Sequence, residues 1–174
     1  MNVIFLDIDG VLNNKEHLFK QYKRLKFIER QMMANDDIYS TVYQDLTVEY
    51  DMLKINQDQL KMVIEVANNT NSKVVMISDL SRQYHYEAFL NNLSELGLPV
   101  IGFLDGTTPY RGKQIKDFVA HNGVDNFVIL DDELAIDYSS DLLNNMVLTY
   151  YEEGLLDRHV TIMYGVLNRM EHRR

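Results

Sequence analysis

The strongest constraint on the fold is the opening stretch of the chain, which reads Val3-Ile4-Phe5-Leu6-Asp7-Ile8-Asp9-Gly10-Val11-Leu12-Asn13. Its leading apolar residues predict a strand that is buried on both faces, as the strands of parallel sheets are. Two carboxylates, Asp7 and Asp9, follow at once, and Gly10 indicates that the backbone turns sharply behind them. Acids at the carboxyl end of such a strand lie where open α/β sheets bind ligands, and a hard cation such as Mg²⁺ commonly holds them together. An Asp-x-Asp-Gly run is also common in surface turns, so the run by itself leaves both interpretations open.

Length and composition limit the possible classes of protein. A chain of 174 residues predicts a single domain, residues 1–174, with a substantial core. No apolar run approaches the ~18 residues of a membrane span, and the absence of cysteine excludes disulfides and thiolate metal sites. We therefore expect a cytoplasmic protein without a membrane partner. The net charge of -9 argues against a large nucleic-acid footprint, because polyanions favour basic surfaces.

The segment 14–55 is predicted to be an insertion after the first strand. Residues 15–34 are expected to form an amphipathic helix, because apolar residues recur there at spacings of three and four. Residues 15–30 also contain six lysines and arginines against two glutamates, which indicates either a solvated helix face or a patch that steers a phosphorylated ligand. Residues 35–55 have no clean period and receive no assignment. The tyrosines of the segment, among them Tyr22 and Tyr50, are expected mostly to pack in the core, with stacking on a base or sugar as the alternative.

From residue 56 onward, the apolar patterns of strands and helices alternate. The predicted strands are 73–77, 98–104, 127–130 and 146–149, and the predicted helices are 56–67, 83–96, 111–121 and 155–171. This alternation predicts an α/β fold, in which a parallel sheet forms the middle layer of a three-layer α/β/α sandwich.

Polar residues follow the apolar strands in a specific order. An acid pair, a hydroxyl, a lysine and a second acid pair succeed one another: Asp7 and Asp9, Ser78, Lys113, and Asp131 with Asp132. The lysine begins the helix before the fourth strand, and the other residues end strands. Because parallel strands end at one edge of the sheet, these side chains are expected to converge on one site.

With these motifs the chain resembles the haloacid dehalogenase (HAD) superfamily of phosphohydrolases over most of its length. The resemblance implies a HAD-like Rossmannoid sheet with a small cap inserted after the first strand. Within the superfamily the chain is most similar to a group found in RNA-repair proteins and phage phosphatases, which are polynucleotide 3′-phosphatase-like and nucleotidase-like. The residues that carry this likeness are Arg82, Arg111-Gly112-Lys113, Val128-Ile129-Leu130-Asp131-Asp132-Glu133, Val147-Leu148-Thr149 and Gly154-Leu155. The chain departs from the group after the second strand, where Ser78-Asp79-Leu80-Ser81-Arg82 replaces a serine run and a Trp-Arg pair.

The resemblance implies roles that the chemistry of these residues supports. Asp7 would be the nucleophile that forms an aspartyl-phosphate, and Asp9 would protonate the leaving oxygen and later activate water. Ser78 would donate a hydrogen bond to a phosphoryl oxygen, and Lys113 would offset the negative charge. Mg²⁺ would bind the Asp7 carboxylate, the Asp9 carbonyl and Asp132, with Asp131 as a ligand either directly or through water. Further candidates for substrate binding are Gly10, Asp79, Arg82 and Arg111.

The function expected from these residues is that of a Mg²⁺-dependent phosphomonoesterase. Its substrate would be a nucleotide, which the acidic net charge favours, or a phosphorylated nucleic-acid end, which the basic helix favours. The alternative is a non-catalytic phosphate-binding or regulatory domain. A receiver domain also uses acids, a hydroxyl and a lysine, but in another order. A phosphotransferase would have to exclude water, which nothing in the sequence indicates. The histidines show no metal-ligand spacing.

Overall fold

A single parallel sheet of five strands forms the centre of the molecule, as seen in a computed structural model that describes residues 1–35, 37–78, 85–104 and 110–168. The strand order is β3-β2-β1-β4-β5, so the first strand of the chain lies in the middle. Its neighbours pair with it over its full length, and Leu6 is level with Met76 on one side and Leu130 on the other. The strands are β1 (Asn2–Leu6), β2 (Ser72–Met76), β3 (Val100–Phe103), β4 (Asn126–Asp131) and β5 (Met146–Leu148).

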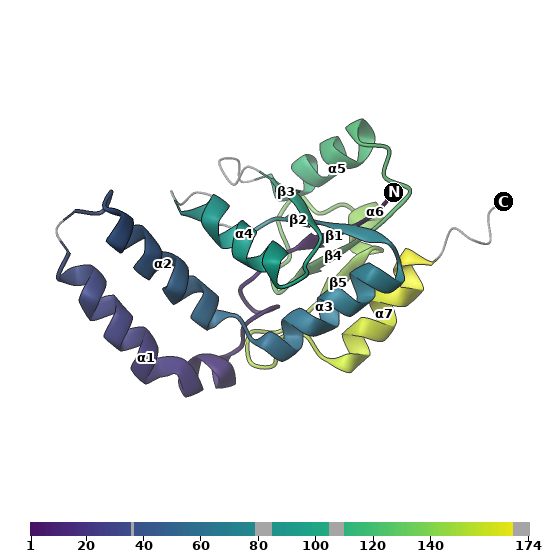
Figure 1. The fold of residues 1–174 in the computed structure, drawn as a ribbon. Helices are drawn as coiled ribbons and strands as arrows, with labels where there is room; N and C mark the ends of the chain where they lie inside the picture. Colours follow the sequence, from purple (N-terminus) through teal and green to yellow (C-terminus); the bar gives the residue numbers. More distant parts are fainter. Residues whose placement is uncertain (36, 79–84, 105–109, 169–174) are drawn as a thin grey trace.

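Helices cover both faces of this sheet (Figure 1). One core cluster joins α3, α4 and α7 to strand residues such as Ile4 and Leu6, and a second joins α5 and α6 to the alternate residues, such as Val3 and Phe5. The side chains of a strand alternate between its faces, so a continuous apolar run supplies both clusters. The helices are α1 (Lys15–Met33), α2 (Thr41–Lys54), α3 (Gln57–Asn69), α4 (Tyr86–Glu95), α5 (Arg111–His121), α6 (Ser140–Leu143) and α7 (Asp157–Leu167).

The predicted α/β fold with a parallel sheet is confirmed, and two elements go beyond the prediction. Residues 41–54, which have no clean apolar period, form the helix α2, and the short helix α6 was not expected. The start of the helix predicted at 83–96 and the end of the helix predicted at 155–171 lie outside the described residues. Among the helices that the structure describes, none is long and apolar enough to cross a membrane.

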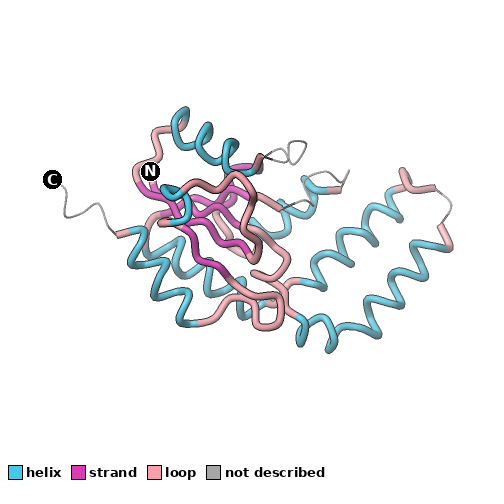
Figure 2. The backbone as a smooth tube through the Cα atoms, turned by 180° about the vertical axis from the view of Figure 1, so that it is seen from behind, coloured by secondary structure: helices cyan, strands magenta, loops and turns pink. Residues whose placement is uncertain are grey.

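The insertion after β1 is a hairpin of two helices, which we call the cap hairpin (α1 and α2, residues 15–54). It stands out to one side of the sheet in both views of the chain (Figure 1, Figure 2). The two helices pack against each other, and α2 also packs against α4. Each begins at a capping side chain: Asn14 accepts from the backbone N–H of His17, and Ser40 accepts from that of Tyr43.

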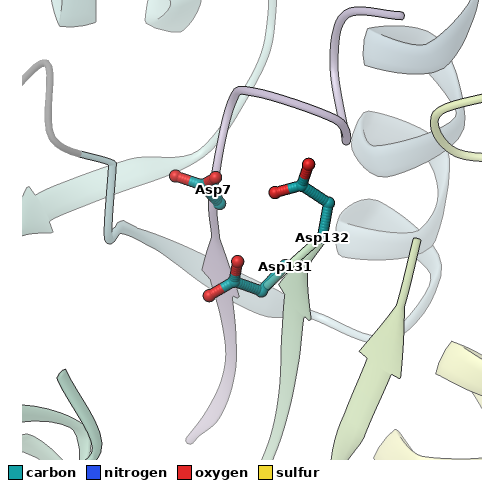
Figure 3. A group of neighbouring side chains, drawn as sticks. All are labelled: Asp7, Asp131 and Asp132. Atoms are coloured by element: carbon teal, nitrogen blue, oxygen red, sulfur yellow. The ribbon is translucent and has the colours of Figure 1, made fainter. Parts of the chain in front are cut away.

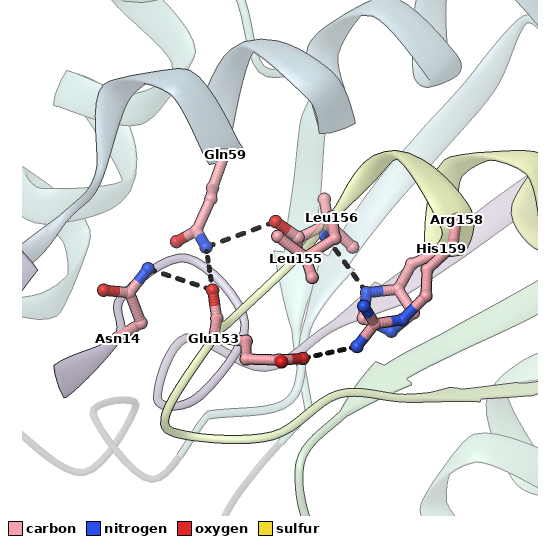
Figure 4. Close-up of polar contacts among 7 residues, drawn as sticks. All are labelled: Asn14, Gln59, Glu153, Leu155, Leu156, Arg158 and His159. Atoms are coloured by element: carbon pink, nitrogen blue, oxygen red, sulfur yellow. Dashed lines mark hydrogen bonds and ion pairs between the residues drawn. The ribbon is translucent and has the colours of Figure 1, made fainter. Parts of the chain in front are cut away.

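The loop between β5 and α7 is hydrogen-bonded both to the start of the cap hairpin and to α3 (Figure 4). The carbonyl oxygen of Glu153 accepts from the Nδ2 of Asn14 at 3.0 Å and from the Nε2 of Gln59 at 3.0 Å, and Gln59 also reaches the carbonyl of Leu155. The chain can approach Gln59 this closely because the next residue is Gly154, where a Cβ would lie 2.1 Å from Nε2. The start of the hairpin is therefore tied to the body of the protein by a partly buried hydrogen bond, in contrast to the exposed tip of the hairpin.

Candidate active site

Three carboxylates meet where the strand order reverses, between the carboxyl ends of β1 and β4. Asp7 directly follows β1, and its backbone N–H still donates to the carbonyl of Leu130 at 2.9 Å. Asp131 is the last residue of β4, and Asp132 follows it. The three side chains offer carboxylate oxygens that lie within 4.8 Å of one another (Figure 3). This crevice is the position at which open α/β sheets bind ligands.

The surroundings of Asp7 and Asp132 oppose their ionisation. Burial and the neighbouring charge of Asp131 hold the pKa of Asp7 well above its usual value. Burial, with the charges of Asp131 and Glu133, raises the pKa of Asp132 to about 6. Carboxylates crowded in this way are stabilised by a cation placed between them.

Asp131 is anchored by donors on all sides. It is fully buried, and its Oδ2 accepts from Nη1 of Arg111 at 2.6 Å and from the hydroxyl of Tyr138 at 3.1 Å, while its Oδ1 accepts from the backbone N–H of Glu133. Burial opposes the charge of Arg111, but Asp131 and Asp7 outweigh it and raise the pKa of the guanidinium. Arg111 therefore supplies a permanent positive charge beside the acid group.

The turn after β1 depends on Gly10 and on Asn13. Gly10 has a φ of 67°, and a Cβ there would lie 2.1 Å from Oδ2 of Asp132, so only glycine lets that carboxylate lie against the turn. Asn13 is fully buried; its Oδ1 accepts from the N–H of Gly10, and its Nδ2 donates to Oδ1 of Asp9 at 2.8 Å. Asp9 itself is exposed, and Asn13 determines how its carboxylate is oriented.

The structure brings together most of the sequence-predicted residues but not Lys113. Lys113 is exposed at the start of α5 and forms an ion pair with Asp117, one turn further along the helix. Arg111, two residues earlier and expected only to contact substrate, is the cation that reaches the acids. Ser78 is buried just beyond the end of β2, and Asp79 and Arg82 lie outside the described residues.

Two residues near the acids were not singled out by the sequence analysis. The first is Asn13, whose place in the opening stretch was noted without a role. The signal that could have indicated it is an amide residue directly after the apolar residues Val11 and Leu12. The second is Tyr86, which begins α4 and is 3% exposed. Within the described part of the chain its hydroxyl has no hydrogen-bond partner, and burial with the charge of Asp7 raises its pKa. No local pattern could have indicated Tyr86, because its position depends on how α4 packs on the sheet.

The cap hairpin contributes a cation to the same neighbourhood. Lys54, at the end of α2, donates to Oδ1 of Asp51 at 3.0 Å, and Nε2 of His85 lies 2.7 Å from Oδ2 of that carboxylate. Asp51 and His85 are both buried, so they join α2 to the start of α4. Burial opposes the charge of Lys54, but Asp51 and, more weakly, Asp9 raise its pKa.

Comparisons with known proteins identify a family through one sequence model. A sequence model of the family described as the HAD domain in Swiss Army Knife RNA repair proteins matches residues 3–160. A solved structure from Thermotoga maritima, assigned as a beta-phosphoglucomutase, has a TM-score of 0.43 and 15% sequence identity to this chain, over 98% of each chain. A search of curated protein sequences finds no match.

Proposed function

The chain belongs to the family of HAD domains in Swiss Army Knife RNA repair proteins, and from this premise we propose that it is a Mg²⁺-dependent phosphomonoesterase that forms an aspartyl-phosphate. The observation that carries the proposal is the group of three carboxylates at the switch point of the sheet, with one arginine beside it. One guanidinium does not balance three carboxylates. The group therefore favours a cation and, with it, an anionic phosphate.

Asp7 and Asp9 divide the covalent chemistry between them. A carboxylate oxygen of Asp7 attacks phosphorus, and the bond from phosphorus to the leaving oxygen breaks as that oxygen takes a proton from Asp9. In the second half, Asp9 takes a proton from water, whose oxygen attacks phosphorus and releases inorganic phosphate from Asp7. The exposure of Asp9 and its hydrogen bond from Asn13 suit this role, because the acid must meet both the leaving group and water.

The donor set fits Mg²⁺, which takes oxygen ligands. We propose that the carboxylates of Asp7 and Asp132 and the carbonyl of Asp9 hold the ion. Asp131, whose Oδ2 already accepts from Arg111 and Tyr138, lies beside these ligands and holds Arg111 next to them. When bound, the ion supplies positive charge that offsets the repulsion between the nucleophile and the phosphate.

Arg111 takes over the charge-balancing role that the sequence analysis assigned to Lys113. Its guanidinium lies against Asp131 and lowers the pKa of Asp7, opposing the stronger effect of burial. It therefore favours the ionised nucleophile. Ser78 remains the proposed donor to a phosphoryl oxygen, and a role of Lys113 requires its side chain to leave Asp117.

The proposed substrate is a nucleotide or a phosphorylated nucleic-acid end, in keeping with the RNA repair proteins in which this type of domain occurs. Gly10, Asp79 and Arg82 remain proposed contacts to substrate. The alternative function, a non-catalytic phosphate-binding domain, would use the same cluster without turnover.

The test is release of inorganic phosphate from an aryl phosphate, with Mg²⁺ and with chelator, by the wild type, Asp7→Asn and the control Asp45→Asn, whose carboxylate is exposed on α2. We expect Mg²⁺-dependent turnover that Asp7→Asn abolishes and Asp45→Asn retains. A wild type without turnover that still binds beryllofluoride, a mimic of the aspartyl-phosphate, would support the non-catalytic alternative. A wild type that shows no turnover and does not bind the mimic would refute both functions.

A further inference from the structure

A groove runs along one flank of the cap hairpin, between α1 and α2. Its volume is about 430 Å³, and most of its lining comes from one side of α1. The residues that line it are Lys15, Leu18, Phe19, Tyr22, Leu25, Lys26, Glu29, Tyr50 and Lys54. Lining residues on α1 extend from Lys15 to Glu29, which at 1.5 Å per residue is about 21 Å of helix.

Exposed aromatic rings line this groove. Phe19 is 81% exposed and Tyr22 is 56% exposed, although both are large enough to serve as core residues. On the α2 side the groove is lined by Tyr50. The Nζ of Lys54 lies 5.4 Å from the centroid of the Tyr50 ring. Aromatic faces left open in this way are stacking surfaces for bases, which every base can use regardless of sequence.

The charge of the groove is positive on a protein whose net charge is -9. It is lined by the lysines Lys15, Lys26 and Lys54 against the single acid Glu29, which lies 2.5 Å from Nζ of Lys26. Lys15 has no ion-pair partner among the residues that the structure describes. Lysines between aromatic rings form the combination that binds single-stranded nucleic acid.

The inner end of the groove, at Lys15 and Lys54, lies near Asp9, which is close enough to Lys54 to raise the pKa of that lysine. Lys15 follows Asn13, the residue that binds Asp9, by two positions, so α1 begins at the turn of the active site. On the other side of the groove Lys54 is held by Asp51, which His85 in turn binds. The groove therefore starts beside the proposed general acid and leads outward along the cap hairpin.

We propose that this groove binds the first nucleotides of a single-stranded nucleic acid, with the terminal phosphate of the strand at Asp7. The inference rests on the function proposed above and commits it to a strand rather than a free nucleotide. A stacked strand advances about 3.4 Å per nucleotide, so a groove of about 21 Å holds several nucleotides, whereas a mononucleotide would occupy only its inner end. Phe19 and Tyr22 are stacking residues in this arrangement, and Lys54 binds backbone phosphate nearest the site.

The experiment compares three substrates: an aryl phosphate, a mononucleotide, and short single-stranded oligonucleotides with a 3′- or a 5′-phosphate. The variants are Phe19→Ala, Tyr22→Ala and Lys54→Met. The matched control is Phe27→Ala, because Phe27 is also exposed on α1 but lines a separate hollow with Lys23, Arg24, Ile28 and Glu49. We expect each aromatic variant to raise KM for the oligonucleotide by about tenfold, and at least ten times more than for the aryl phosphate. Phe27→Ala should behave as the wild type.

Binding measured without turnover separates this inference from the proposed function. Fluorescence anisotropy of a labelled, phosphorylated oligonucleotide on Asp7→Asn protein should show binding that weakens steeply with salt. Adding Phe19→Ala or Tyr22→Ala should weaken that binding by about tenfold. If Phe19→Ala and Tyr22→Ala weaken strand binding no more than Phe27→Ala does, the proposed groove is overturned. A mononucleotide that binds as tightly as the oligonucleotide, or a phosphopeptide that binds more tightly, would also overturn it. Strand binding through the groove with no turnover of any substrate would refute only the phosphatase.

Discussion

Replacing Gly10 with alanine tests the geometry of the carboxylate cluster directly. A Cβ at this position would lie 2.1 Å from Oδ2, 2.3 Å from Cγ and 2.5 Å from Cβ of Asp132. Ordinary contact begins at 3.4 Å, so the carboxylate must move by 3.4 Å less 2.1 Å, about 1.3 Å. Since the Cβ of Asp132 is also too close, a change of rotamer does not relieve the clash, and the backbone after β4 has to shift.

The size of the effect follows from that displacement. A catalytic group misplaced by about 1 Å typically costs about 100-fold in rate, and we expect at least this loss in kcat/KM together with weaker Mg²⁺ binding. Alanine at a positive φ also costs about 1–2 kcal/mol of backbone strain. Gly123→Ala is the matched control, because Gly123 has a φ of 59° but nothing within 4 Å of its Cβ position.

The assays are phosphate release from an aryl phosphate, titration calorimetry with Mg²⁺, and thermal unfolding. Gly123→Ala should lower the melting temperature by a few degrees and leave kcat/KM and Mg²⁺ affinity near those of the wild type. Gly10→Ala should lose both. If Gly10→Ala binds Mg²⁺ and turns over like Gly123→Ala, the contact between Gly10 and Asp132 has no part in the site, and the reasoning is refuted.

Two further predictions concern the charges around the cluster. Arg111→Met should lower the free energy of unfolding by about 3–5 kcal/mol, since it leaves Asp131 buried without a cation, whereas Lys113→Met, at an exposed position, should change it by under about 0.5 kcal/mol. Urea titration measures both free energies. A larger loss of turnover in Lys113→Met than in Arg111→Met would return the charge-balancing role to Lys113. The pKa values of Asp7 and Asp132 are raised in the folded state, so their ionisation destabilises the metal-free protein: this cost is absent below the unfolded pKa near 4 and grows as the pH rises through the folded values, about 6 for Asp132. The melting temperature without metal should therefore rise as the pH falls from 7.5 to 5.5, and saturating Mg²⁺ should flatten that rise. If an Asp132→Asn variant shows the same dependence of melting temperature on pH as the wild type, Asp132 does not contribute to it and the assignment is contradicted.

Much of the site could be predicted because its residues stand at strand ends. The apolar run of β1 and the acids after it indicate both a buried strand and where it stops, and the same holds for β4 and Asp131 with Asp132. The choice between Arg111 and Lys113 could not be predicted in this way. Both lie in the first turn of α5, and only the packing of that helix against the sheet determines which side chain points toward Asp131.

The cap hairpin shows a similar division. Residues 41–54 form a helix without a clean apolar period, because α2 contacts both α1 and α4 and buries polar residues, Thr47 and Asp51, instead of one apolar stripe. The positive charge of α1 is visible in the sequence, but whether it is a solvated face or the wall of a groove depends on the helix that lies beside it.

The sequence by itself therefore determined the parallel sheet, the order of its motifs and the acids at its edge, because strand periodicity and strand ends are local properties of the chain. Tertiary structure decided which cation meets those acids, how Asn13 and Gly10 shape the turn, and how Tyr86 and Lys54 come near the site. These depend on contacts between residues far apart in the chain, such as that of Gly10 with Asp132, more than a hundred positions away, and no local pattern in the sequence encodes them.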